Sequence, residues 1–308
     1  MSSSSATPAT PGLLGANLIC MASMLIWAAG LPAADRLIPL MAPEQLNALR
    51  MGLSALFLIP VWALVEGFGP LARVNWVKGF FVGALIGLGA WFLILGQARS
   101  GPVTVAVISS MLPVIGVALE VAFDGRKLTL GLVLGLILSV AGALMALDLG
   151  KGDLSLGLGA LICFASVVSF AFGSRLTVSA FPNETPLGRT TVTLTGAALA
   201  ATCVALLQWA LGAPDPSFAA WGWTEVGAIF LFSIGALGIS QLMFIMSVEK
   251  LGIGLSAIHI NAAPFYVMLI LFALGGAWSW TQAGAAAIVG LGVLVAQGLI
   301  PLPFGRRA

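Results

Sequence analysis

Ten apolar stretches, each long enough to cross a lipid bilayer, constrain the fold of this chain more than any other feature. About 20 apolar residues in a helix span the ~30 Å of hydrocarbon in a bilayer. Short breaks rich in Gly, Pro and charge separate the stretches. The sequence therefore predicts ten transmembrane segments, at residues 12–32, 44–66, 76–98, 102–123, 127–148, 155–179, 186–211, 221–246, 253–275 and 279–301.

The stretches are continuous apolar runs and not short alternating ones, which favours helices over the strands of a membrane barrel. The chain is 60% hydrophobic and 8% charged, against ~45–50% and ~25% in soluble domains. Soluble enzymes and secreted disulfide scaffolds are thereby excluded. We expect an all-α membrane protein whose surroundings are the lipid bilayer.

Basic residues and cysteines exclude further classes of partner. The thirteen Lys and Arg residues are scattered and form no stripe that could bind nucleic-acid phosphates. Cys20, Cys163 and Cys203 lie inside apolar stretches without C-x-x-C spacing, so they predict neither a disulfide nor a metal site. We expect no nucleic-acid partner, no metal and no cofactor.

The distribution of charge predicts an orientation. Residues 1–11 are uncharged and rich in Ser, Thr and Pro, which is typical of a disordered tail and not of a cleaved signal peptide. If this tail is cytoplasmic, ten spans return the short basic C-terminal tail to the same side. Nine of the thirteen basic residues then lie at cytoplasmic ends, in agreement with the positive-inside rule.

The two halves of the chain resemble each other. Leu18-Ile-Cys-Met-Ala-Ser23 matches Leu161-Ile-Cys-Phe-Ala-Ser166 without a gap, and the same offset carries Gly30 onto Gly173. The sequence therefore predicts two five-helix repeats, residues 12–149 and 150–308. Further downstream the matching pairs are Arg50 with Arg189, Trp76 with Trp223, Gly101 with Gly252 and Pro113 with Pro264.

An odd number of spans in each repeat inverts the second copy in the membrane. Inverted repeats are typical of secondary transporters, which bind their substrate near mid-bilayer at the repeat interface and work by alternating access. The alternative is a duplicated helix bundle kept only for packing.

These features resemble a known family. The first helix contains Trp27-Ala-Ala-Gly30, the second contains Ala48-Leu-Arg50, and the fourth contains a proline. With these motifs the chain resembles EamA-type members of the drug/metabolite transporter superfamily over residues ~12 to 302. Within it the chain resembles the YddG-like exporters of amino acids. The resemblance implies a bacterial inner (plasma) membrane location and a central cavity lined mainly by helices one, three, four, six, eight and nine.

Polar residues and prolines in two predicted helices are the first candidates for substrate contact. His259 and Asn261 precede Pro264 in the ninth, and Ser109 and Ser110 precede Pro113 in the fourth. Polar groups at membrane depth normally face the bundle or a watery cavity. A proline removes a backbone donor, frees a carbonyl and kinks a helix, so both prolines are predicted hinges. Interhelical hydrogen bonds and packing are the alternative explanation.

Deep aromatic residues are the second group of candidates. Trp27, Trp91 and Phe170, which is the repeat partner of Trp27, suit a substrate with an apolar or aromatic side chain, although they can equally pack against other helices. Ser166 and Gln241 complete the predicted substrate-binding set. The second half has Ser169-Phe170 where the first has Ile26-Trp27, so the two sides of the cavity differ chemically.

Charged residues narrow the substrate class. No acidic residue is predicted near mid-membrane, which argues against a proton-coupled exporter of cations. Arg50 and Arg189 are predicted to snorkel to the interface, or else to bond helix C-terminal carbonyls. A neutral or zwitterionic solute fits this distribution better than a strong anion.

Two other classes of function are weaker. Ser256 and His259 are three apart and share a helix face, but no third residue orients the imidazole and no protease motif is present. We therefore expect no enzyme and no catalytic residue. A channel would need a ring of equivalent polar groups.

The sequence thus predicts an exporter of small amphipathic metabolites, most of all amino acids including aromatic ones. A nucleotide sugar or a quaternary ammonium compound is the alternative substrate. A monomer and a homodimer are both compatible with the sequence.

Overall fold

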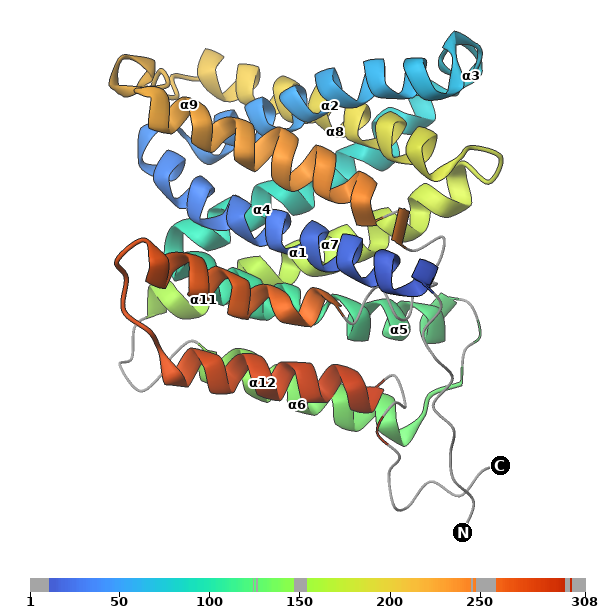
Figure 1. The fold of residues 1–308 in the computed structure, drawn as a ribbon. Coiled ribbons are helices and arrows are strands. Elements are labelled where there is room, and N and C mark those ends of the chain that lie inside the picture. The colour runs from blue at the N-terminus through green and yellow to red at the C-terminus, as the bar shows by residue number, and fades with distance from the viewer. Residues whose placement is uncertain are drawn as a thin grey trace.

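The computed structural model describes residues 11–123, 125, 127–146, 154–244, 246–247, 259–296 and 300, and these residues form helices and turns without a strand. Most helices run across the view of Figure 1 in alternating directions. The helices are α1 (Pro11–Leu37), α2 (Pro43–Glu66), α3 (Phe68–Arg73), α4 (Trp76–Ser109), α5 (Leu112–Phe123), α6 (Leu130–Ala146), α7 (Leu154–Ala180), α8 (Pro186–Ala210), α9 (Trp223–Phe230), α11 (Ala263–Ala273) and α12 (Trp280–Ala296). Short 3₁₀ turns are η1 (Ile38–Leu40), η3 (Phe218–Ala220) and η5 (His259–Ala262), and η4 (Leu231–Ile239) is π-helical.

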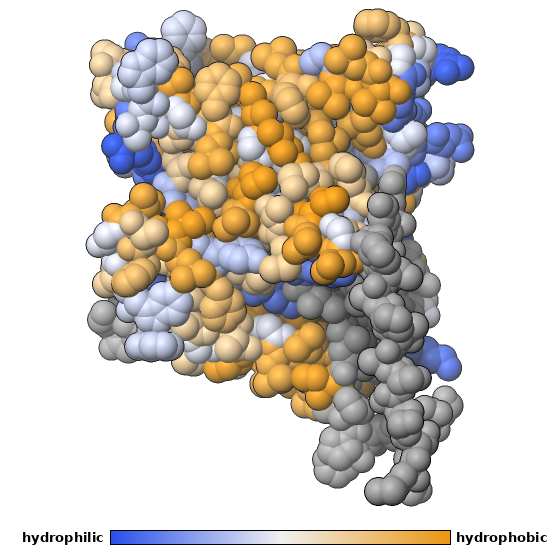
Figure 2. All heavy atoms as spheres, viewed as in Figure 1, coloured by the Kyte–Doolittle hydropathy of each residue, from blue (hydrophilic) through white to orange (hydrophobic). Residues whose placement is uncertain are grey.

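The expected class, an all-α membrane protein, is confirmed. Within the described residues, six helices are long and apolar enough to cross a membrane. Large apolar side chains face outward, such as Leu64, which is 86% exposed. Figure 2 shows an apolar middle with hydrophilic side chains mostly toward the two ends of the helices. The six spans are Leu14–Leu40, Pro43–Glu66, Trp76–Ser109, Gly157–Ala180, Pro186–Ala210 and Trp223–Phe244, and shorter apolar helices cover Leu112–Phe123, Leu130–Gly142, His259–Ala273 and Trp280–Ala296.

The first helix extends further than the predicted span 12–32, because α1 continues through Pro32 to Leu37. A proline inside a membrane helix is tolerated where neighbouring helices satisfy the freed backbone groups. Next to this proline, Gln97 of α4 ties the two helices together, since its Nε2 donates to the carbonyl of Leu31 at 2.6 Å.

A sharp turn at Gly101 divides α4 into two arms. Gly101 has φ 77° and ψ 167°, and the helix resumes at Pro102. A residue without Cβ is required at this positive φ. The turn falls in the predicted break between the spans 76–98 and 102–123.

The core is built around α4, which packs extensively against α7 and α8. On the other side, α1 packs against α9, η4 and α11, and α2 packs against α8 and η4. The pair α6 and α12 forms a layer at one side of the bundle (Figure 1).

Glycines bring α4 and α8 unusually close together. A Cβ added at Gly83 would overlap the carbonyl oxygen of Thr193 and the amide of Ala197, and it would lie 2.7 Å from the carbonyl carbon of Gly196. Small residues permit this close approach of membrane helices. We call the contact the glycine seam, which comprises Gly79, Gly83 and Gly87 of α4 and Gly196 of α8.

Candidate functional site

Turns that are not α-helical lie just before the prolines that the sequence singles out, and we call these turns the interruptions. Pro113 is the second residue of α5, and a turn at 110–111 separates it from α4. Pro264 is the second residue of α11 and follows the 3₁₀ turn η5. Because proline has no N–H, the carbonyls of Ser109 and Ile260, four residues earlier, lose their helical donors. The interruptions precede two prolines that the predicted repeat pairs with each other, and the hinge role of the prolines stays a prediction.

The serines at the first interruption differ in environment. Ser110 is 1% exposed and its hydroxyl donates to the carbonyl of Ala106 at 3.0 Å. Its side chain therefore satisfies the helix locally. Ser109 is half-buried and is the better placed of the two to meet a solute.

The second interruption carries the predicted polar pair. His259 and Asn261 both lie in η5 and both are half-buried. The Oδ1 atom of Asn261 is buried and has no hydrogen-bond partner among the described residues. Leaving such an acceptor unsatisfied costs about 1–3 kcal/mol, so a ligand donor at this oxygen would be stabilising. Residues 253–258 of the predicted ninth span, Ser256 included, lie outside the described residues.

The predicted aromatic residues separate into two environments. Trp91 stacks on Phe92 with ring centroids 5.8 Å apart, and its buried Nε1 has no partner in the described part of the chain. Phe170 packs beside the buried residues shared by α2, α4 and α8. Trp27 instead packs on a different apolar cluster, which α1 shares with α7 and α11.

Backbone contacts place Ser166 and Phe170 at the interface between α4 and α7, whereas Trp91 lies two residues beyond Gly89 and so on another face of α4. A Cβ added at Gly89 would lie 3.1 Å from the carbonyl of Ser166 and 3.2 Å from the amide of Phe170. Gln241 follows η4 and is half-buried.

An apolar cluster joins the segments that carry most predicted site residues. It includes Ala28 beside Trp27, Val167 beside Ser166, and Ala263 beside Pro264. The structure therefore brings α1, α4, α7 and α11 together around this cluster. The central cavity itself stays a prediction.

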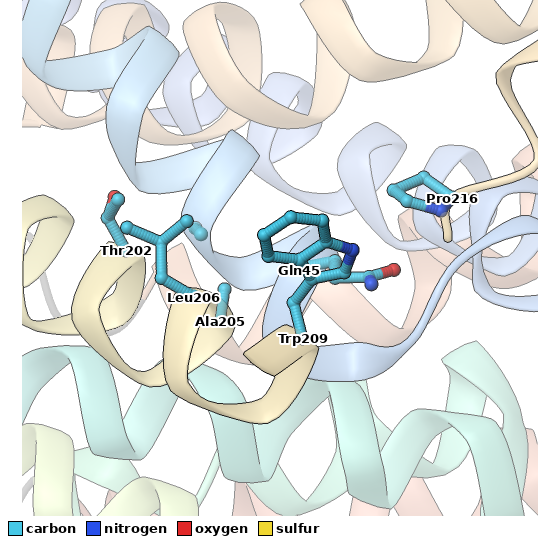
Figure 3. Close-up of a pocket in the computed structure, with 7 residues that line it drawn as sticks. Gln45, Thr202, Ala205, Leu206, Trp209 and Pro216 are labelled. Atoms are coloured by element: carbon cyan, nitrogen blue, oxygen red, sulfur yellow. The ribbon is translucent and has the colours of Figure 1, made fainter. Parts of the chain in front are cut away.

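A groove of about 360 Å³ lies elsewhere, between α2, α8 and the segment that follows α8 (Figure 3). Its polar groups already have partners, since Gln45 Nε2 donates to Pro214 O at 2.7 Å and Trp209 Nε1 donates to Asp215 Oδ1 at 2.8 Å. These bonds attach the segment to the bundle. The groove is lined by Gln45, Ala48, Thr202, Ala205, Leu206, Trp209 and Pro216, none of them a predicted site residue.

Sequence reasoning missed a row of buried polar side chains on α2. Asn47, Arg50 and Ser54 are 3%, 4% and 0% exposed, and we call them the polar stripe. Their spacing of three and seven residues places them on one helix face. That spacing is the signal that could have found them.

The polar stripe contacts α4 and η4. Asn47 Nδ2 donates to Gly87 O at 3.0 Å, and the Ser54 hydroxyl lies 2.9 Å from Ser233 O. The Arg50 guanidinium lies 4.0 Å from the centre of the Phe232 ring.

The predicted snorkelling of Arg50 is therefore wrong, because this face of α2 is covered by η4 and α4. Arg189 behaves as the alternative predicts. Its Nε donates to Phe181 O and its Nη2 to Pro182 O, both at 2.7 Å, just beyond the end of α7.

The fold and its apolar surface define a multi-pass helical membrane protein. Residues 14–147 match the EamA-like transporter family. The chain is also 27% identical over 270 residues to the uncharacterised transporter YyaM of Bacillus subtilis (strain 168), which covers 85% of this chain and 87% of that protein. The chain is therefore similar to the EamA-like transporter family over residues 14–147.

A crystal structure of a protein 23% identical in sequence has the same fold. The match has a TM-score of 0.65 and covers 94% of this chain and 99% of the other. At this identity the likeness concerns the fold alone.

Proposed function

We propose that this transporter exports small amphipathic solutes, most of all amino acids including aromatic ones, by alternating access. In this proposal residues 12–149 and 150–308 are inverted repeats in an inner (plasma) membrane, with both termini cytoplasmic. The observation that carries it is the pair of helix interruptions before Pro113 and Pro264. Discontinuous helices at corresponding positions of two repeats are typical of transporter binding sites.

Reciprocal packing supports the repeat. The contact of α7 with α4 has its counterpart in the contact of α1 with α9 and η4, and α5 with α7 corresponds to α11 with α1. The matched glycines fit the same scheme. A Cβ at Gly30 would overlap that of Ala236 in η4, and one at Gly173 would lie 2.7 Å from Cγ1 of Ile86 in α4.

The chemistry of the predicted site residues supports the proposed solute class. Asn261 Oδ1 is buried and has no hydrogen-bond partner among the described residues, so it suits a polar donor of a solute, and His259 and Ser109 add further polar atoms. Trp27, Trp91 and Phe170 offer aromatic faces, on which a ring or apolar side chain gains about 0.5–1.5 kcal/mol beyond its burial. A zwitterion with an apolar side chain uses both kinds of group.

Uptake into proteoliposomes tests the proposal. The panel contains radiolabelled Phe, Trp, Thr, Met, a nucleotide sugar and a quaternary ammonium compound, and it compares the wild type with His259→Ala. Gln208→Ala is the control, because this exposed polar residue near the end of α8 lies outside the predicted site.

We expect saturable amino-acid uptake that the control retains and His259→Ala loses. Uptake of only the nucleotide sugar or the cation would refute the substrate class. Unimpaired amino-acid uptake by His259→Ala would refute the site.

A further inference from the structure

Arg50 is a buried cation that has no counter-charge among the residues the structure describes. It lies seven residues into α2, about 10 Å along the helix at 1.5 Å per residue, and it is 4% exposed. Its Nε atom has no hydrogen-bond partner in the described part of the chain. The face of Phe232 at 4.0 Å is its one close electrostatic contact there.

The nearby acidic side chains have other partners. Glu225 at the start of α9 forms an ion pair with Arg36 at 2.9 Å. Asp35 at the end of α1 faces Gln97, and Asp215 accepts from Trp209. None of the described carboxylates forms an ion pair with Arg50.

An unpaired charge in this position is unfavourable. A cation–π contact offsets only part of the cost of burying a charge without an ionic partner. Ionisable groups in membrane helices normally have a partner or belong to a functional site. An anionic ligand would supply the charge that the described residues do not.

Neighbouring polar atoms add to the same site. The Ser54 hydroxyl lies between Arg50 O at 2.8 Å and Ser233 O at 2.9 Å, so it joins these two turns. The Ser233 hydroxyl is buried and, like Arg50 Nε, has no partner among the described residues. Ser233 also belongs to η4, and π-helical segments are frequent at functional sites.

We propose that Arg50 and Ser233 bind the carboxylate of the transported solute, an inference that rests on the proposed amino-acid transport. A guanidinium presents paired N–H donors that match a carboxylate in a bidentate arrangement. One cation balances one negative charge, which favours a carboxylate over a phosphate dianion. Phe232 packs on the flat face of the guanidinium, which leaves the N–H groups at its edge for the carboxylate.

Competition experiments on the wild type test the ligand chemistry first. Unlabelled 3-phenylpropionate keeps the carboxylate of phenylalanine and lacks its amine, and 2-phenylethylamine is the reverse. We expect the acid to compete with radiolabelled Phe at concentrations at least tenfold lower than the amine. Equal competition by both compounds would overturn the inference, and this result needs no variant to fold.

Variants of Arg50 then test whether this residue binds the carboxylate. Arg50→Gln should raise the half-saturating Phe concentration roughly 10- to 100-fold, as expected for a lost charge-assisted bond. Competition by 2-phenylethylamine should stay unchanged. Arg50→Lys should lie between, since it keeps the charge and loses the paired geometry. Arg99→Gln is the control, because Arg99 is exposed and its Nη1 bonds only Leu95 O.

The outcomes separate the two proposals. Unchanged Phe affinity in Arg50→Gln, or equal loss of the acid and the amine, would overturn the role of Arg50 and leave amino-acid transport intact. A wild type that takes up no amino acid would instead refute the proposed function.

Discussion

Replacing Gly83 with alanine should destabilise the protein through the glycine seam. The added Cβ would overlap Thr193 O and Ala197 N and lie 2.7 Å from the Gly196 carbonyl carbon. These are backbone atoms, which no rotamer change can move. Restoring an ordinary carbon contact of about 3.5–4.0 Å requires α4 and α8 to separate by about 1 Å.

The size of the effect follows from two opposing terms. A gap of 0.5–1 Å forfeits a quarter to a half of the dispersion energy of each contact, and overpacking in cores costs about 1–3 kcal/mol. Alanine recovers up to ~1 kcal/mol through its helix propensity. We expect a net loss of about 1–2 kcal/mol in the free energy of unfolding.

Gly52→Ala provides the matched control. Gly52 also lies inside a helix, α2, but a Cβ there would meet nothing within 4 Å. Only the propensity gain of up to ~1 kcal/mol remains, so this variant should be as stable as the wild type or more stable. Thermal unfolding in detergent, followed by size-exclusion chromatography, measures both. A Gly83→Ala protein that unfolds at or above the temperature of Gly52→Ala would refute the reasoning.

Three further predictions concern single contacts and the topology. A double-mutant cycle of Arg36→Ala and Glu225→Ala should give a coupling energy of about 0.2–1 kcal/mol in thermal unfolding, because Arg36 is 58% exposed and exposed pairs contribute little; a coupling above ~2 kcal/mol would contradict this. Ser54→Ala should lower the free energy of unfolding by about 1 kcal/mol, since it loses the bond that joins α2 to η4; an unchanged unfolding temperature would show that this bond is dispensable. In a cysteine-free background, a membrane-impermeant maleimide added to intact cells should label Pro216→Cys and spare Gly69→Cys, and the opposite pattern would reverse the proposed orientation.

The spans could be predicted because bilayer thickness fixes the length of an apolar helix. Helix starts that a proline marks in the local sequence were also predicted accurately. For example, α2 and α8 begin at Pro43 and Pro186, within one residue of expectation. The end of α1 was not, because a proline is compatible both with the end of a helix and with a kinked continuation, and here α1 continues through Pro32 to Leu37. The six-residue α3 is too short to give a hydropathy signal.

Only part of the candidate site could be predicted from the sequence. Pro113 and Pro264 act on their own backbone, so the interruptions can be read from the sequence. The burial of Arg50 cannot, because a snorkelling arginine and a buried one have the same local sequence. The neighbour that decides is Phe232, which is distant in the chain and belongs to the π-helical η4, and no sequence pattern predicts that contact.

The glycine seam also bears on how this protein can change by mutation. Along Gly79, Gly83 and Gly196 the space for even one methyl group is filled by another helix. A library that substitutes every position in turn should therefore tolerate almost nothing there, although none of these residues is proposed to touch a solute. New substrate preferences would therefore have to come from substitutions at other residues, while the spacing between α4 and α8 stays the same.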